Sequence, residues 1–266
     1  MAIHPTAIVD KNSDIASDVE IGPHVIIEPN VKIGRGVKIF PNSYIFSNTK
    51  IGEGTEIHMG AVLGNVPQDL AFENKKSFLI IGKRNIIREY VTIHRGTKEN
   101  TSTIIGDNNF LMGASHVGHN CRIDNNVIIA NGALLAGYVT VGDSCFISGN
   151  VVVHQFCRIG RLSMIGGFSG VNKDVPPYML VRGPSVVWSI NLVGLRRAKF
   201  DKKTINDIKE AYNFIYHLGL NTEQAVEKIL ELKPGKEIMC LVDFIRNSKR
   251  GICKYRFEGE DREYFE

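Results

Sequence analysis

The chain has 266 residues, of which 43% are hydrophobic and 23% charged, and its formal net charge is +4. This is the composition of a globular protein, and it excludes disorder, a collagen-like repeat and a strongly charged tail. No apolar run approaches the roughly 20 residues that a membrane helix needs, and the N-terminal segment lacks the apolar core of a signal peptide. We therefore expect a cytoplasmic protein with no stable membrane insertion, and the five scattered cysteines fit reduced thiols there.

A repeat of six residues covers the first two thirds of the chain. Taking every sixth residue from Ile3 to Val171 gives 29 positions, and 26 of them are Ile, Leu or Val. A helix of period 3.6 cannot keep this repeat on one face, whereas a short strand points residues i and i−2 inward and i−1 outward. A turn must follow in each hexad, and we expect the Gly that often follows the aliphatic residue, as in Ile21-Gly22, to permit it. Repeats of this kind predict a parallel β-helix.

Three hexads make one triangular coil, so residues 18 apart are predicted to lie above one another at a spacing of roughly 4.8 Å. The repeat then gives about nine to ten coils. Two polar segments, residues 67–77 and 97–102, break the repeat without changing its phase, and each predicts a loop extruded from the prism. Because Leu63, Ile81 and Val117 are in phase modulo 18, we expect the first loop to leave the prism edge that carries residues 115–119.

The C-terminal third has a different pattern. The repeat ends after residue 171, where two consecutive prolines cannot donate to a strand ladder. From about residue 200 the apolar spacing is helical, and it predicts a helix closed by Gly219, a second capped by Thr222 and a third ending at Gly251. We therefore divide the chain into a β-helix domain, 1–190, and a helical domain, 191–266, with a charged and mobile tail at 258–266.

The 18-residue coil brings three distant stretches to one edge of the prism. His119, Gly137 and Gln155 form one column, and Gly118, Ala136 and His154 form the next. His116 and Tyr138 lie on the same edge. A polar cluster with three histidines on a rigid scaffold is a candidate functional site.

The histidines could instead serve the structure or bind a metal. His58, His94 and His116 could be solvated or could line a contact between subunits. His116, His119 and His154 could converge on zinc, but no carboxylate ligand accompanies them on the prism, so we expect no metal.

Acid–base chemistry suits this edge better. A neutral His can take a proton from a hydroxyl or an amine at pH 7. The backbone N–H of Gly137, one coil away, can stabilise the oxyanion of acyl transfer. Together these groups favour attack on a thioester carbonyl.

Several motifs carry a resemblance that covers the whole chain. They are Pro-Gln-Asp-Leu at 67–70, Arg-Glu-Tyr-Val-Thr-Ile-His-Arg-Gly-Thr at 88–97, His-Val-Gly-His at 116–119, Val-His-Gln-Phe-Cys at 153–157, Asp-Val-Pro-Pro-Tyr at 174–178 and the run 191–197. With these motifs the chain resembles the UDP-N-acetylglucosamine O-acyltransferase family of lipid A biosynthesis. The resemblance implies a mainly β fold, a left-handed parallel β-helix with a C-terminal α-helical domain, assembled as a homotrimer with its sites between neighbouring prisms.

The resemblance also implies an activity and its residues. The family transfers an R-3-hydroxyacyl group from acyl carrier protein to the 3-position of UDP-N-acetylglucosamine, and we expect no cofactor. The implied catalytic residues are His119 as general base and Gly137 as oxyanion donor. The implied substrate-binding residues are Gln68 and Asp69 at the sugar, His116, Tyr138, His154 and Gln155 around the sugar nucleotide, and Asn191 and Arg197 at the uridine diphosphate. Gly167 matches the position that sets acyl length, and a glycine there implies a chain of about 14 carbons.

Some positions depart from the family pattern and leave alternatives open. Tyr138 stands where many members have His, and Asn120 follows the base where many have Asp. The acceptor could therefore be a 3-amino analogue of the sugar, and a sister hexapeptide N-acyltransferase or a small-amine acetyltransferase is a further alternative. A non-enzymatic ice-binding β-helix needs an outward Thr ladder that the sequence lacks.

A basic segment, residues 196–203, follows the nucleotide-contacting run. It is either a solvated helix start or a docking site for the acidic carrier protein through Lys199, Lys202 and Lys203. Nucleic acid is not an expected partner, because the net charge is mild and no platform of basic and aromatic residues is present.

Overall fold

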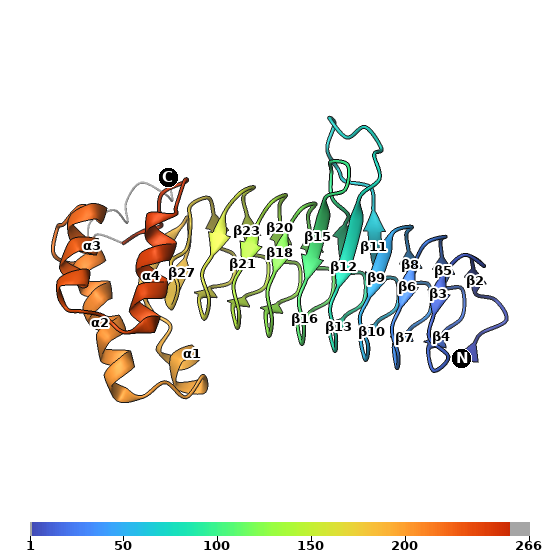
Figure 1. Cartoon of the computed structure of the whole chain (residues 1–266), viewed down its shortest axis with the longest axis horizontal. Helices are drawn as coiled ribbons and strands as arrows, with labels where there is room; N and C mark the ends of the chain where they lie inside the picture. The colour runs from blue at the N-terminus through green and yellow to red at the C-terminus, as the bar shows by residue number, and fades with distance from the viewer. Residues whose placement is uncertain (1, 256–266) are drawn as a thin grey trace.

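The computed structural model describes residues 2–255, which form a long three-sided prism with a group of helices at one end (Figure 1). Short parallel strands wind around the prism axis, so the fold is a left-handed parallel β-helix with a C-terminal helical part, as the sequence predicted. The charged segment 258–266 lies outside the described residues. Within residues 2–255, none of the helices combines the length and the apolarity that crossing a bilayer requires.

Each side of the prism is one sheet, and consecutive strands pass from one sheet to the next. The first sheet contains β1 (Ala2–Ile3), β4 (Glu20–Ile21), β7 (Lys38–Ile39), β10 (Glu56–Ile57), β13 (Ile86–Ile87), β16 (Phe110–Leu111), β19 (Ile128–Ile129), β22 (Phe146–Ile147), β25 (Met164–Ile165), β27 (Met179–Arg182), β28 (Val186–Ile190) and β29 (Lys254–Tyr255). The second sheet contains β2 (Ile8–Val9), β5 (Ile26–Ile27), β8 (Tyr44–Ile45), β11 (Val62–Asn65), β14 (Thr92–His94), β17 (His116–Val117), β20 (Leu134–Leu135), β23 (Val152–Val153) and β26 (Gly170–Val171). The third sheet contains β3 (Asp14–Ile15), β6 (Lys32–Ile33), β9 (Thr49–Ile51), β12 (Phe78–Ile81), β15 (Ser102–Ile105), β18 (Arg122–Ile123), β21 (Thr140–Val141) and β24 (Arg158–Ile159).

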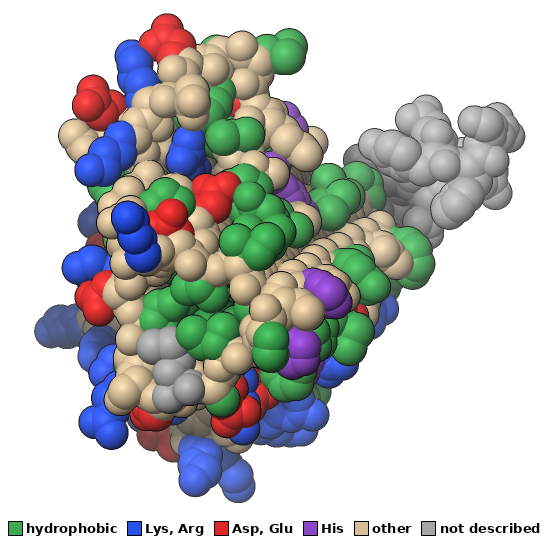
Figure 2. Space-filling model, turned by 90° about the vertical axis from the view of Figure 1, so that its right-hand side faces the viewer, with side chains coloured by type: hydrophobic (Ala, Val, Ile, Leu, Met, Phe, Trp, Pro, Cys, Tyr) green, Lys and Arg blue, Asp and Glu red, His purple; other side chains and the backbone are tan. Residues whose placement is uncertain are grey.

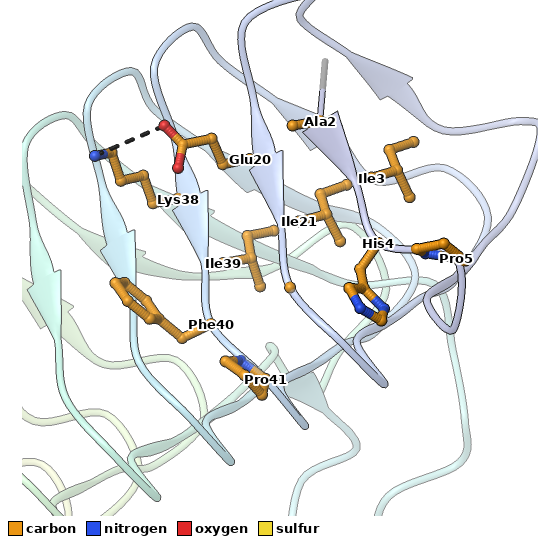
Figure 3. Close-up of a pocket in the computed structure, with 11 residues that line it drawn as sticks. Ala2, Ile3, His4, Pro5, Glu20, Ile21, Lys38, Ile39, Phe40 and Pro41 are labelled. Carbon is orange, nitrogen blue, oxygen red and sulfur yellow. Dashed lines mark ion pairs between the residues drawn. The ribbon is translucent and has the colours of Figure 1, made fainter.

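The register confirms the 18-residue coil outside the two interruptions. Ile3 pairs with Ile21, and Ile21 pairs with Ile39, so the three side chains form one column inside the prism (Figure 3). The same offset recurs in β17, β20 and β23, where Val117, Leu135 and Val153 are fully buried. Stacked aliphatic side chains therefore form a continuous core, and burying each of them contributes roughly 1.5–3 kcal/mol.

The corner turns depend on a different residue from the one we expected. The left-handed backbone, with φ near +60°, recurs at intervals of six residues, three positions after the inward aliphatic side chain, and Asn often occupies it, as at Asn30, Asn42 and Asn120. The Gly directly after the aliphatic residue serves close packing instead, because a Cβ at Gly52 would meet the backbone of Gly82 in the next coil. The expectation that this Gly supplies the turn conformation is wrong.

The two predicted loops rise from the middle of the prism, between β11 and β12 and between β14 and β15 (Figure 1). They change the coil length, which the spacing of the hexads does not reveal. Ile81 pairs with Ile51, 30 residues earlier, and with Ile105, 24 residues later. Ile81 therefore belongs to the third sheet, and the residue beside Leu63 on the second sheet is Ile93. The first loop does leave the expected edge, but the argument from Ile81 is wrong.

The prism continues past the prolines that were expected to end it. Pro176 and Pro177 lie at a corner, where no ladder donor is needed, and β27 then pairs in parallel with β25. The strand β28 runs antiparallel to β27, and β29 returns from the helices to pair with β28. Sequence periodicity missed these three strands because they no longer follow the hexad.

The helices are α1 (Leu192–Arg197), α2 (Lys202–Tyr216), α3 (Thr222–Glu231) and α4 (Lys236–Arg246). The cap of α3 is Asn221 and not Thr222, because Asn221 and Gln224 form a reciprocal capping box. The last helix ends at Arg246, before the expected Gly251. Glu237 of α4 accepts hydrogen bonds from Tyr178 and Arg161, which join the helices to the end of the prism. The domain boundary at residue 190 stays a prediction.

Candidate active site

A cleft of about 230 Å³ lies along the edge that follows the second sheet. Its polar lining is Gln68, His94, His116, His119, Gly137 and Gln155, and its apolar lining includes Leu134 and Val152. A larger groove of about 500 Å³ lies at the N-terminal end of the prism, where Figure 3 shows mostly apolar residues and the Lys38–Glu20 ion pair. Of these two, only the smaller cleft gathers several histidines able to move a proton, so we place the candidate active site there.

His119, Gly137 and Gln155 are stacked on this edge, as the 18-residue coil predicted. The Tyr138 N–H donates to the His119 carbonyl at 2.9 Å, and the Phe156 N–H donates to the Gly137 carbonyl at 3.1 Å, so the three turns follow one another directly. His119 is 6% exposed. A Cβ at position 137 would collide with the His119 ring near Cε1 and Nε2, so only glycine lets the imidazole lie against the next coil.

The Asn120 side chain orients the imidazole. Asn120 Oδ1 lies 3.1 Å from His119 Nδ1. An amide oxygen can only accept a hydrogen bond, so this contact places the proton on Nδ1 and leaves the lone pair on Nε2, on the side of Gly137. The amide thereby replaces the carboxylate that many relatives of the resembled family have at this position.

Two more histidines form the floor of the cleft. His94 is 4% exposed, and its ring meets the ring of His116 edge-on at a centroid distance of 4.7 Å. Burial, with the nearby His116 and His119 rings, lowers the pKa of His94 to about 4. Burial, with His119, also lowers the pKa of His116, whose Nδ1 lies 2.7 Å from the Thr92 hydroxyl. Both rings are therefore neutral near pH 7 and can act as hydrogen-bonding groups.

Two more predicted residues, Tyr138 and His154, lie next to this group. Tyr138 contacts His119 edge-on at 5.3 Å and stacks on Phe156 at 5.0 Å. His154 is exposed, and its Nδ1 lies 3.1 Å from the Gln155 carbonyl oxygen. Within residues 2–255, no group of three or more His, Cys, Asp or Glu side chains is arranged to hold a metal ion.

The first extruded loop contributes to the cleft through Gln68. Asp69 is exposed, and its carboxylate accepts the Ala71 N–H at 2.9 Å, so in the single chain it stabilises its own loop. The histidine His58 lies elsewhere, stacked on Phe40 at 4.7 Å and 3.7 Å from a Glu56 carboxylate oxygen.

Three predicted residues lie away from the cleft in the single chain. Asn191 is buried as the N-cap of α1, where its side chain accepts the Gly194 N–H and donates to the Leu162 carbonyl. Arg197 is exposed in the last turn of α1. Gly167 is exposed on the corner that follows the first sheet, two coils beyond Gly137. The structure of one chain does not bring these residues to His119.

Sequence reasoning missed His94 as a member of the cleft. The coil that holds the second loop is longer, so Ile93 pairs with Val117 and places His94 beside Gly118. Leu134 and Val152 were also missed, although both occupy outward strand positions, where large apolar side chains are a signal of a binding surface.

Comparison with known proteins agrees with this geometry. Residues 174–253 match the family model described as Udp N-acetylglucosamine O-acyltransferase, domain 2. Residues 102–137 match the bacterial transferase hexapeptide model, and residues 3–66 match that of the GMPPB C-terminal domain.

Three relatives match almost end to end. The chain is 46% identical to the acyl-[acyl-carrier-protein]–UDP-N-acetylglucosamine O-acyltransferase of Halorhodospira halophila, covering 95% of this chain and 99% of the relative. It is 42% identical to the protein of the same name from Syntrophobacter fumaroxidans, with 96% and 100% covered. The solved UDP-N-acetylglucosamine acyltransferase of Bacteroides fragilis superposes with a TM-score of 0.91 at 43% identity, covering 94% of this chain and 99% of that one.

Proposed function

The chain belongs to the UDP-N-acetylglucosamine O-acyltransferase family, and we propose that it carries out the first step of lipid A biosynthesis with His119 as its general base. It is an acyltransferase whose relatives are named for acyl carrier protein and UDP-N-acetylglucosamine. The transferred group in our proposal is an R-3-hydroxyacyl chain of about 14 carbons. The observation that supports the base is the contact of Nδ1 with Asn120, which leaves Nε2 free beside Gly137.

The proposed reaction moves one proton and one acyl group. His119 Nε2 takes the proton of the sugar 3-hydroxyl as its oxygen attacks the thioester carbonyl of the acyl carrier protein. The Gly137 N–H donates to the oxyanion of the tetrahedral intermediate. When the intermediate collapses, the C–S bond breaks, the ester forms, and the imidazolium returns its proton to the leaving sulfur. Base and oxyanion donor together contribute on the order of 10⁴- to 10⁷-fold.

The sugar nucleotide occupies the polar part of the cleft in this proposal. Gln68, His116 and Gln155 hold the sugar, and the neutral His94 and His116 rings line the floor. Asp69, Tyr138 and His154 complete the substrate contacts, and Asn191 and Arg197 hold the uridine diphosphate. The last two residues reach the cleft only from a neighbouring subunit, because both lie beyond the end of the prism in their own chain.

The proposed assembly is a homotrimer with each site between two prisms. The outward faces support this arrangement. The upper part of the first sheet presents Ile86, Phe110, Ile128, Phe146 and Met164, whereas the third sheet presents charged residues such as Asp14, Lys32 and Arg122. Figure 2 shows this uneven distribution from the N-terminal end, with the charged side chains concentrated on the left. A second prism packed on the apolar faces would also enclose the acyl chain, which a single edge cannot bury.

Gly167 limits acyl length in this assembly. It is exposed, and a Cβ there would meet only the Gly149 carbonyl at 3.4 Å and the Ser148 side chain at 3.9 Å, so the chain itself has room for a larger side chain. A glycine at this corner therefore leaves space that a long acyl group can occupy.

The experiment that tests the proposed function is a discharge assay. Purified protein receives R-3-hydroxymyristoyl acyl carrier protein with either UDP-N-acetylglucosamine or its 3-amino analogue. We expect rapid ester formation by the wild type and a loss of at least about 10²-fold in His119→Ala. Preference for the amine would favour the alternative N-acylation, and full activity of His119→Ala would remove the assigned base.

A further inference from the structure

Asn120 contacts more than His119, because a threonine from the second extruded loop reaches the same oxygen. The Thr97 N–H donates to Asn120 Oδ1 at 3.0 Å, and the Thr97 hydroxyl lies 2.9 Å from that oxygen. A backbone N–H can only donate, so the atom that faces it must be the amide oxygen and not the amide nitrogen. Thr97 thereby fixes the orientation of the Asn120 side chain.

The chain of hydrogen bonds continues to Tyr138. The Thr97 hydroxyl donates its only proton to Asn120, so it accepts from the Tyr138 hydroxyl, which lies 3.1 Å away. Tyr138 in turn meets the His119 ring edge-on at 5.3 Å. The network therefore surrounds the imidazole on two sides and links it to a segment that the hexad repeat does not require.

The rest of the Asn120 environment is also fixed. Its backbone has φ +58°, which Asn tolerates better than most residues, and its N–H donates to Thr103 Oγ1 at 2.8 Å. Rotation of the amide would lose the bonds from Thr97 and His119 together. The position of the imidazole thus depends on a loop residue that does not itself line the cleft.

We propose that Thr97 is a positioning residue: through Asn120 it holds the proton of His119 on Nδ1 and so keeps Nε2 available as the base. The inference rests on the proposed function of His119. It assigns to the second loop a part in catalysis that is distinct from substrate contact. A neutral amide in place of a carboxylate also means that the base is oriented without a charge beside it.

Substitution of Thr97 tests the inference. Thr97→Val keeps the size and the backbone donor but removes the hydroxyl, and we expect kcat to fall about tenfold with the KM for the sugar nucleotide within about twofold. Thr97→Ser should restore most of the rate. Thr101→Val is the matched control, because the Thr101 hydroxyl bonds only within the same loop, to Lys98, and its rate should match the wild type. Wild-type kcat in Thr97→Val would overturn the proposal.

A charge placed on the network gives a readout that folding does not affect. Asn120→Asp can accept the same hydrogen bonds and puts a carboxylate beside Nδ1, which raises the pKa of His119. The acidic limb of the pH profile of kcat/KM should therefore move up by about one unit. An unmoved limb would show that Asn120 does not act on the base.

The tautomer itself can be measured without substrate. In ¹⁵N-histidine spectra of the full-length protein, assigned with His119→Ala, the wild type should show His119 protonated at Nδ1, and Thr97→Val should show a mixture. Protonation at Nε2 in the wild type would overturn the inference. Failure of the proposed function appears separately, as full activity of His119→Ala, and would remove the catalytic meaning of the network while the spectrum still reports its geometry.

Discussion

Gly137 decides where the His119 ring can lie. A methyl group at position 137 would overlap the imidazole, although the backbone there requires no left-handed conformation. We therefore expect Gly137→Ala to fold normally and to lower kcat by about 10²-fold, because the base moves away from its productive position. Steady-state kinetics and the midpoint of thermal unfolding measure the two effects. A variant with wild-type kcat would show that the contact between ring and glycine is unimportant.

The buried His94 makes stability depend on pH. Its pKa falls from 6.5 to about 4 on folding, so the folded protein refuses a proton that the unfolded chain accepts in this range. Stability contributed by the neutral ring is complete above pH 6.5 and is lost as the pH falls towards 4, by on the order of 3 kcal/mol. Burial of His116 acts in the same direction.

Urea unfolding at fixed protein concentration across this pH range measures the effect. We expect His94→Gln to flatten the slope of unfolding free energy against pH compared with the wild type. Identical slopes would mean that His94 is protonated in the folded protein.

At the scale of elements, the constant coil length made part of the site predictable. Between Ile105 and Val171 no insertion interrupts the hexads, so counting by 18 correctly placed His119, Gly137 and Gln155 on one edge. His94 precedes the second loop, and the same count fails across it because the coil there has 24 residues. Spacing alone cannot show how many residues a loop removes from the prism.

The end of the prism was harder to predict for a similar reason. Strands β27, β28 and β29 pair by a different rule, and one of them comes from beyond the helices. The proline pair looked like a stop because only the strand interior excludes proline, and the sequence does not show where a corner falls. Helix positions were predictable from apolar spacing, whereas the Asn221 cap depends on side-chain geometry.

The start of α2 offers a prediction about the acyl donor. Lys203 is paired with Asp207 at 2.8 Å, so Lys199 and Lys202 carry the charges most available to an acidic carrier protein. Reversal of both to Glu should raise the KM for acyl carrier protein about tenfold at low salt with kcat little changed, because the charges act on encounter. Steady-state kinetics at two salt concentrations measure this. Unchanged kinetics at low salt would exclude docking at this helix.

At the scale of the whole molecule, the apolar outward faces point to assembly. Three copies of the 29.6 kDa chain give about 89 kDa, which sedimentation equilibrium can distinguish from a monomer or a dimer. Phe146 lies on the apolar part of the first sheet, and a charge there would be buried against the neighbouring prism. We expect Phe146→Arg to shift the protein towards monomers and to reduce activity in parallel. Arg122→Ala on the charged third sheet is the control, and a monomeric wild type would contradict the assembly.

The most direct measurement is a crystal structure of the wild type with its acylated sugar-nucleotide product. The account predicts that the ester oxygen at the sugar 3-position lies within about 3.2 Å of His119 Nε2, in the cleft lined by Gln68 and Gln155. The acyl chain should run between two prisms and end near Gly167. A product bound in the N-terminal groove, or held in the cleft with its ester far from His119, would contradict the account.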